Sequence, residues 1–286
     1  MATRRTPPAG SPGATPKAAG AQAAAIADAL LREYGDARCA LLHRTPFELL
    51  VATILSAQCT DERVNQVTPT LFAAMPTPQA VVESRPGDLE AIIRSTGFFN
   101  AKAKNIRGAC ALLVERFGGR VPRTMEELLM LPGVARKTAN VVLGTGFGIR
   151  SGFVVDTHIH RLSRRLGLTE HDDPEKVEQD LCRLLPDHDW IQLGHSLISH
   201  GRRICTARAP DCERCPIASL CISRGLAPDA WKRKDTKRGA SRAARTRPAS
   251  IASKPRHARG RMAQGPGPSD TRDGQSRSGS SRRRRG

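Results

Sequence analysis

The chain has 286 residues, a formal net charge of +19 and only 3% aromatic residues. No run of 18 apolar residues occurs and no apolar segment follows the N-terminal arginines, so we expect neither a membrane span nor a secretory signal. Without a secretory signal, the eight cysteines are better explained as thiols or metal ligands than as disulfides.

The positive charge is concentrated at the two ends of the chain. Residues 232–286 contain 18 Lys and Arg against 3 Asp, and residues 1–20 contain three basic residues and no acid. Residues 21–231 are nearly neutral and long enough for one large or two small hydrophobic cores. We interpret the first 20 residues as a disordered arm rather than a transit peptide, and residues 232–286 as a disordered basic tail. Their compositions bury too little apolar surface to offset the entropy of ordering.

Helical patterns follow one another through the near-neutral segment. Thr45 precedes Pro46 and Glu48, an order typical of a helix start, and the helix that follows is almost wholly apolar, so we place it in the core. The predicted helices cover residues 23–34, 48–58, 61–74, 101–117, 173–185 and 190–200. We find no alternating strand pattern and no internal repeat, so the predicted fold class is all-α.

Residues 124–145 have the pattern of two helices joined by a tight turn. Thr124 and Glu127 are spaced as in a capping box, and Pro132-Gly133 must end the helix that they begin. A second helix can begin near Ala135. The backbone N–H groups of the turn would then lie at a helix N-terminus, where an anion such as phosphate is favoured.

Two chemically active side chains follow this turn. Lys137 lies one turn into the second helix of the hairpin, and Asp156 follows the apolar run Phe153-Val154-Val155. Asp156 is well placed to cap a helix that carries Ile159 and Leu162. Taken singly, each has a plain structural interpretation, with Lys137 as a solvated helix lysine and Asp156 as only a cap.

Four of the eight cysteines lie in one short segment, with the spacing Cys205-x6-Cys212-x2-Cys215-x5-Cys221. We expect them to share a metal, and both zinc and a cubane iron–sulfur cluster accept four cysteines. Four-cysteine zinc sites usually contain two C-x2-C pairs, whereas this segment contains one. We interpret the other cysteines as buried apolar residues and four histidines as structural or surface residues: Cys39, Cys59, Cys110, Cys182, His158, His160, His195 and His200.

Four stretches together resemble the endonuclease III branch of the helix-hairpin-helix DNA glycosylases. They are PFELLVATILSAQCTD (46–61), TGFFNAKAKNI (96–106), LPGVARKTANVVL followed by VDTH, and the four-cysteine segment. The resemblance spans roughly residues 26–225. It implies that Cys205, Cys212, Cys215 and Cys221 bind a 4Fe-4S cluster, which favours iron over zinc.

The resemblance also implies two helical domains. A contiguous barrel domain would comprise residues 39–149 and contain the hairpin. The N-terminal helix (21–38) would join residues 150–231 in a cluster domain. Lys137 and Asp156 would then come from opposite sides of a cleft between the domains, where we expect the pocket for the damaged base.

Several residues acquire DNA-binding roles from the resemblance. Gln58 matches a glutamine that wedges into the DNA stack where the damaged base leaves, although by itself it would be interpreted as a helix cap. Phe98 matches an apolar residue that enters the duplex beside the lesion, although one of Phe98 and Phe99 is expected in the core. Arg208, in the cysteine segment, is expected near the DNA.

The hairpin turn departs from the family pattern at one position. The family commonly has Gly-Val-Gly where this chain has Gly133, Val134 and Ala135. The turn is expected to bind DNA phosphate through backbone N–H groups, which alanine retains. If this position required a positive φ, alanine would cost about 1 kcal/mol.

The implied activity is that of a bifunctional DNA glycosylase and abasic-site lyase acting on oxidised pyrimidines. Lys137 would attack C1′ of the sugar to form a Schiff base, and Asp156 would stabilise positive charge on the sugar or help to activate the nucleophile. β-Elimination would then cut the strand 3′ to the site. Attack requires a neutral amine, which we expect burial and the neighbouring Arg136 to favour.

Two other functions fit parts of the pattern. A monofunctional glycosylase that removes mismatched adenine is disfavoured by Lys137 and by a tail composition without a second folded domain. A non-catalytic iron–sulfur DNA-binding protein would use Lys137 only as a phosphate contact. We expect a monomer that binds damaged double-stranded DNA and no membrane. We place it in the cytoplasm at a bacterial nucleoid, or in the nucleus or mitochondria of a eukaryote.

Overall fold

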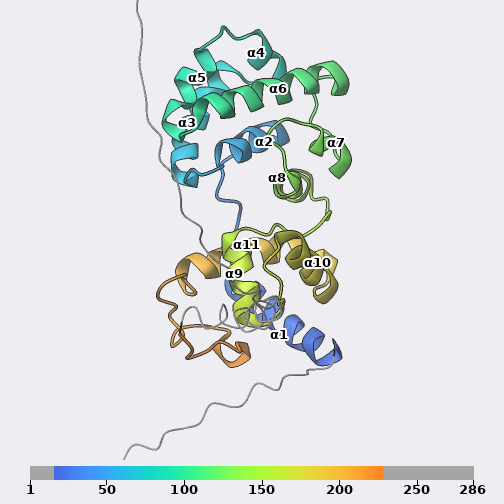
Figure 1. The fold of residues 1–286 in the computed structure, drawn as a ribbon, viewed down its shortest axis with the longest axis vertical. Coiled ribbons are helices and arrows are strands. Elements are labelled where there is room, and N and C mark those ends of the chain that lie inside the picture. Colours follow the sequence, from blue (N-terminus) through green and yellow to red (C-terminus); the bar gives the residue numbers. More distant parts are fainter. Residues whose placement is uncertain (1–15, 228–286) are drawn as a thin grey trace, which may run out of the picture. The chain divides into compact units, whose positions relative to one another are not determined.

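The computed structural model describes residues 16–227. The expected basic tail (232–286) and most of the expected N-terminal arm (1–20) lie outside this range. Within the range, helices and turns occur but no strand, which confirms the all-α prediction (Figure 1). No helix in this part of the chain combines the length and the apolarity that crossing a bilayer requires.

The helices agree closely with the predicted ranges, although the first begins earlier, at Pro16. A π-helical turn, Val142–Gly146, follows α8 directly. The α-helices of the described range are α1 (Pro16–Tyr34), α2 (Pro46–Leu55), α3 (Asp61–Ala74), α4 (Pro78–Glu83), α5 (Asp88–Ile93), α6 (Phe99–Phe117), α7 (Met125–Leu129), α8 (Arg136–Val141), α9 (Thr157–Leu166), α10 (Pro174–Leu184) and α11 (Trp190–Arg203).

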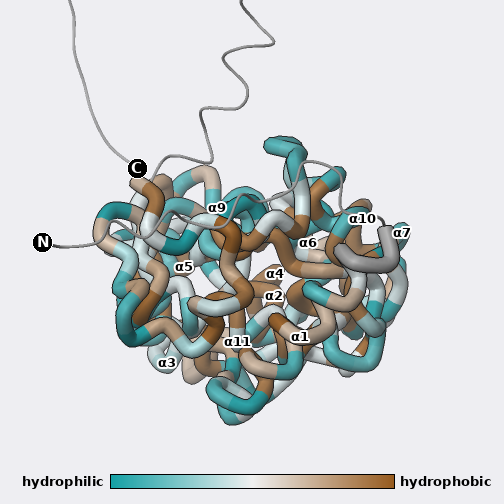
Figure 2. Tube along the Cα trace, turned by 90° about the horizontal axis from the view of Figure 1, so that it is seen from below, coloured by the Kyte–Doolittle hydropathy of each residue, from teal (hydrophilic) through white to brown (hydrophobic). Residues whose placement is uncertain are grey.

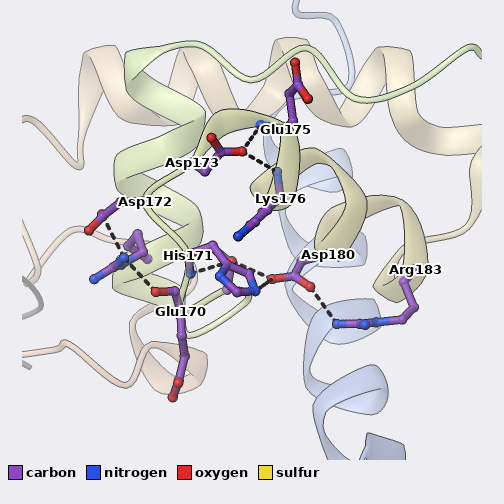
Figure 3. Close-up of polar contacts among 10 residues, drawn as sticks. Glu170, His171, Asp172, Asp173, Glu175, Lys176, Asp180 and Arg183 are labelled. Atoms are coloured by element: carbon purple, nitrogen blue, oxygen red, sulfur yellow. Dashed lines mark hydrogen bonds and ion pairs between the residues drawn. The ribbon is translucent and has the colours of Figure 1, made fainter. Parts of the chain in front are cut away.

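Local side-chain caps explain where several helices begin. The hydroxyl of Thr45 accepts a hydrogen bond from the backbone N–H of Glu48 at 3.2 Å, and Pro46 occupies the first helical position, as predicted. Asp173 accepts from the backbone N–H groups of two residues at the start of α10, each at 3.1 Å (Figure 3). Such caps involve residues two or three positions apart, so they can be predicted from the sequence alone.

A first hydrophobic core is formed by residues between Leu41 and Leu143. Helix α2 lies in its centre, since Leu49, Ala52 and Leu55 are completely buried. Helix α6 packs against α4 and α5 (Figure 1). This core carries both the turn after α2, where Gln58 lies, and the hairpin.

A second hydrophobic core joins α1 to the chain from Phe153 to Ile217. Helix α1 packs against α11, and the hydroxyl of Ser196 donates to the carbonyl of Tyr34 at 3.0 Å. In Figure 2 hydrophobic and hydrophilic residues are interspersed along the helices, and many of the turns at the outside are hydrophilic. The chain therefore contributes α1 to the second core, builds the first core, and then returns to complete the second.

Polar contacts fix α10 beside α9 (Figure 3). Arg164 of α9 donates to the carboxylate of Asp172 at 2.7 Å and to the carbonyl of Glu170 at 2.8 Å. Asp180 of α10 accepts from the hydroxyl of Thr169, in the segment after α9, and from Arg183 of α10, both at 2.6 Å. These contacts hold the helix that carries the buried carboxylate Glu178.

Candidate active site

The predicted hairpin consists of α7, a turn and α8. The hydroxyl of Thr124 accepts from the backbone N–H of Glu127 at 3.3 Å and donates to its carboxylate at 2.9 Å. Gly133 has φ +80°, and a Cβ there would lie 2.9 Å from the Cβ of Asn105, so the position requires glycine. Ala135 is an extended N-cap with φ −97°, so alanine carries no left-handed strain there.

One cavity of about 160 Å³ is lined by both predicted catalytic residues. Lys137 reaches it from α8, and Asp156 from the N-cap of α9. The carboxylate of Asp156 accepts the backbone N–H of Ile159 at 2.7 Å, which confirms the predicted cap. The cap holds one carboxylate oxygen at a defined position beside the cavity.

The surroundings of Lys137 differ from the expectation. Its side chain is exposed rather than buried. Arg136 donates through Nε and Nη2 to the carboxylate of Glu178, at 2.8 and 3.0 Å. Arg136 is therefore engaged by a buried carboxylate on α10, and the expected burial of the lysine is not found.

One face of α11 forms a cavity wall that we did not predict. Ile191, His195, Ser199 and Arg202 recur every three or four residues and therefore face the same side of the helix. The sequence carried no clear signal for this face, because polar residues such as Gln192, Ser196 and His200 also occur on other sides of α11. Sequence reasoning alone could not say which partner that face meets.

His195 is the most buried titratable group of this wall. Burial lowers the pKa of the imidazole, and the nearby charges of Arg38 and His43 lower it further, which favours the neutral form of the ring. Its Nε2 lies 3.5 Å from the hydroxyl of Thr145, in the π-helical turn. The sequence predicts a structural or surface role for His195, and the structure places this residue at the cavity.

An ion pair crosses the edge of the same cavity. Arg202 of α11 donates to Asp61, at the start of α3, at 2.6 Å. Arg208 is exposed, as a DNA contact would need to be. The two arginines are close in sequence but differ in setting, since Arg202 is engaged by a carboxylate from the first core.

Gln58 and Phe98 share an unusual backbone conformation. They are the only non-glycine residues with positive φ in the described range, at 52° and 49°. Such conformations cost about 1–3 kcal/mol each and concentrate at functional sites. Gln58 is exposed and Ser56 is the C-cap residue of α2, so the structure does not favour the capping interpretation of Gln58.

The turn that presents Phe98 is fixed by a buried lysine of α6. Phe98 is 69% exposed, whereas Phe99 packs against the first core. Lys102 is only 4% exposed, and its ammonium donates to the carbonyl of Thr96 at 2.7 Å. Burial lowers the pKa of Lys102. This hydrogen bond ties the turn before Phe98 to α6.

The four cysteines of residues 205–221 line one small cavity. No three His, Cys, Asp or Glu side chains in the described range converge closely enough to hold a single metal ion. Four thiols that face one small cavity are a donor set that an iron–sulfur cluster accepts. Burial raises the pKa of Cys215 to about 11, so cluster binding must displace its proton.

Arg165 supports this loop from α9. Its guanidinium donates to the Sγ of Cys205 at 3.2 Å and to the carbonyls of Thr206 and Ala207 at 2.7 and 2.9 Å. Of the cysteines outside the loop, Cys110 is buried as expected. Cys39, Cys59 and Cys182 are only partly buried, because each lies near the edge of a core.

Comparisons with known proteins agree with this geometry. Residues 51–187 match the family described as the HhH-GPD superfamily base excision DNA repair protein. Residues 205–221 match the iron–sulfur binding domain of endonuclease III. The chain is 56% identical over 194 residues to endonuclease III of Synechocystis sp., which covers 68% of this chain and 89% of that protein.

Two solved structures resemble the described fold. A non-covalent endonuclease III–DNA complex is 44% identical, with a TM-score of 0.68, over 71% of this chain and 95% of that chain. A trapped endonuclease III–DNA covalent intermediate is 43% identical, with the same TM-score and the same two coverages.

Proposed function

Because the chain belongs to the endonuclease III family, we propose that Lys137 and Asp156 are its catalytic residues. The protein is a DNA glycosylase and abasic-site lyase of base excision repair, and it binds a 4Fe-4S cluster. The observation that carries the residue assignment is that both side chains line one cavity although they are 19 positions apart in sequence.

The cavity supports a reaction on an extruded base. A base inside a duplex cannot be attacked, so the enzyme has to flip it into a pocket. The Lys137 amine attacks C1′ as the base departs, and the Asp156 carboxylate stabilises the positive charge that develops on the sugar. The resulting Schiff base acidifies the C2′ proton, and β-elimination cuts the strand on the 3′ side. The related trapped DNA intermediate supports this covalent route.

The substrates that we propose are oxidised pyrimidines in duplex DNA. The cavity offers several uncharged hydrogen-bonding side chains to a flipped base, among them Thr145, His195 and Ser199. A neutral pyrimidine with carbonyl oxygens and ring N–H groups can use such partners. The polar wall formed by α11 supports this choice.

The duplex would contact the surface that surrounds the cavity. Gln58 fills the gap that the flipped base leaves in the duplex, and Phe98 enters the base stack beside that gap. Arg208 contacts the DNA backbone. The turn of Gly133, Val134 and Ala135 binds phosphate through its N–H groups. Gly133→Val should weaken binding to all duplexes alike, because valine is strained at φ +80° and overlaps Asn105.

The cluster ligands that we propose are Cys205, Cys212, Cys215 and Cys221. When bound, the cluster would hold four thiolates together and thereby order a loop in which only Ile217 is a fully buried hydrophobic residue. The two hydrophobic cores would correspond to two domains, residues 39–149 and residues 21–38 with 150–231. We further propose that the enzyme acts as a monomer in the cytoplasm of a bacterium, at the nucleoid.

A borohydride trapping experiment tests the nucleophile. The parent protein, incubated with an abasic duplex and borohydride, should yield a covalent adduct. Lys137→Gln should bind the same duplex and yield none, because the amide cannot form a Schiff base. Lys104→Gln is the matched control, since Lys104 is an exposed lysine on α6 away from the cavity. It should trap at the parent level.

A second variant separates base removal from strand cleavage. Asp156→Asn retains an acceptor for the cap but removes the charge, so base removal should fall by about two orders of magnitude. Cleavage at a preformed abasic site should suffer less, because no base remains to be expelled. An adduct that persists in Lys137→Gln would identify another amine as the nucleophile. Absence of an adduct in the parent would favour a monofunctional glycosylase or a non-catalytic DNA-binding protein.

A further inference from the structure

A buried carboxylate lies behind the catalytic cavity and makes contacts that the proposed reaction does not use. Glu178 is only 5% exposed and belongs to α10, in the second core. It accepts two hydrogen bonds from Arg136 and a third, at 3.0 Å, from the side-chain amide of Asn140. Arg136 and Asn140 are four positions apart on α8, so they lie on one face of the helix, with Lys137 between them in sequence.

The same network reaches the segment that leads to Asp156. Asn140 is 2% exposed, and its Oδ1 accepts from the hydroxyl of Ser151 at 2.8 Å. The next residue is Gly152, where an added Cβ would overlap the Oε1 of Glu178 and lie 3.1 Å from the Nδ2 of Asn140. The backbone at Gly152 therefore packs directly against the carboxylate, and only a residue without a side chain fits there.

Glu178 thus connects two segments of the cavity wall. One is α8, which carries Lys137, and the other is residues 151–156, which end at Asp156. Asn140 and Gly152 themselves line the cavity, so the network lies directly behind the proposed reacting groups. A buried carboxylate must keep its partners, because an unpaired buried charge is costly. The three hydrogen bonds fix α8 to the carboxylate. Residues 151–156 are fixed to the same network by the Ser151–Asn140 hydrogen bond and by the close packing of Gly152 on Glu178.

We propose that Glu178 is a positioning residue that sets the spacing of Lys137 and Asp156 across the cavity. The inference rests on the proposed catalytic roles of these two residues. Reacting atoms must be held close to the attack geometry, and a displacement of about 1 Å can lower a rate roughly 100-fold. Loss of the Glu178 contacts would release α8 from α10. The Lys137 amine, which α8 carries, would then no longer be held at the attack distance from the sugar.

The first core provides a matched control. Glu48 is also 5% exposed and also pairs with an arginine, since it accepts from Nη2 and Nε of Arg44 at 2.8 and 3.0 Å. Its partner is four residues away on the same segment, so the pair connects no two parts of the cavity. Glu48→Gln therefore removes a buried, arginine-paired carboxylate without touching the proposed geometry.

The test measures single-turnover cleavage and borohydride trapping at saturating abasic duplex, with the cluster-loaded full chain. A purely structural role lowers the reacting amplitude and the melting temperature but leaves the rate constant of the folded fraction unchanged. We expect Glu178→Gln to lower the rate constant roughly tenfold and Glu178→Ala roughly 100-fold, with little change in duplex Kd. Glu48→Gln should retain the parent rate constant.

A second route to the same displacement guards against a variant that fails to fold. In Gly152→Ala the added methyl group overlaps the Glu178 carboxylate and displaces it from the side of residues 151–156. This variant should also lower the rate constant and leave the duplex Kd unchanged. The inference is overturned if the Glu178 and Gly152 variants keep the parent rate constant, or lose only amplitude, as a structural change would. A trapped adduct in Lys137→Gln would instead withdraw the proposed function, whatever the Glu178 variants do.

Discussion

The turns around Gln58 and Phe98 and the cysteine loop of residues 205–221 are held in different ways. Both turns belong to the first core, where α2, α3 and α6 pack tightly beneath them. In the cysteine loop, Ile217 is the only fully buried hydrophobic residue, and Arg165 donates hydrogen bonds to the carbonyls of Thr206 and Ala207. A packed core can hold strained backbone at its surface, whereas we expect a loop with a single fully buried hydrophobic residue to need the iron cluster to order it.

The largest expected effect concerns the cysteine loop. Cys212→Ser should lose iron, lower the melting temperature and expose residues 205–221 to protease, because cluster binding organises the loop. The measurements are iron content and limited proteolysis read by mass spectrometry.

The control for this variant is Cys182→Ser, which changes a partly buried thiol of the second core away from the loop and should keep its iron. If residues 205–221 of the iron-free protein resisted protease as well as those of the loaded protein, the loop would not depend on the cluster. It would then be held by packing, as the turns around Gln58 and Phe98 are.

A smaller effect is expected at the turn before Phe98. Lys102→Met removes the ammonium that bonds the carbonyl of Thr96 but keeps the apolar stem, so stability should fall by about 1–3 kcal/mol. Urea unfolding measures this, and iron content should not change. Lys104→Met, on the exposed side of α6, should leave stability within experimental error. Loss of iron in Lys102→Met would show that the two regions are not independent.

A pair of variants at Gln58 sharpens the contrast between strain and function. Gln58→Gly relieves the positive φ and should be more stable than Gln58→Ala, which retains it, by about 1 kcal/mol. Both should lose more activity on a duplex than on a single-stranded lesion, because only the duplex leaves a gap to fill. Equal losses of activity on the duplex and on the single-stranded lesion would contradict the wedge role of Gln58. Equal stabilities of the two variants would show that the backbone at Gln58 is unstrained.

The smallest effect is the acid response of the first core. Burial raises the pKa of Glu48, but hydrogen bonds from Arg44 outweigh it and hold the pKa below its ordinary value of 4.5. A carboxylate with a lowered folded-state pKa stabilises the fold above pH 4.5 and loses that contribution as pH falls through the folded-state pKa. Glu48→Gln should therefore flatten the stability profile below pH 4.5, as measured by thermal unfolding. An unchanged acid slope would assign the response to other carboxylates.

Local sequence chemistry was sufficient to predict much of the framework. The threonine cap of α2 and the aspartate cap of α9 act over three residues, so their partners are visible in the sequence. The four cysteines lie within one short segment, so their spacing also predicted a shared metal from the sequence alone. The class of fold and the place of the hairpin followed from such short-range signals.

Other features depended on contacts between distant residues. The sequence alone could not show that Arg136 pairs with Glu178, 42 positions away, or that one face of α11 lines the cavity. It also left the backbone of Ala135 undecided, and only the turn's packing shows that φ is negative there. Helix starts are determined locally because caps and turns satisfy nearby backbone groups. The orientation of a helix face, and hence the partner of each buried charge, is decided only when the two cores pack.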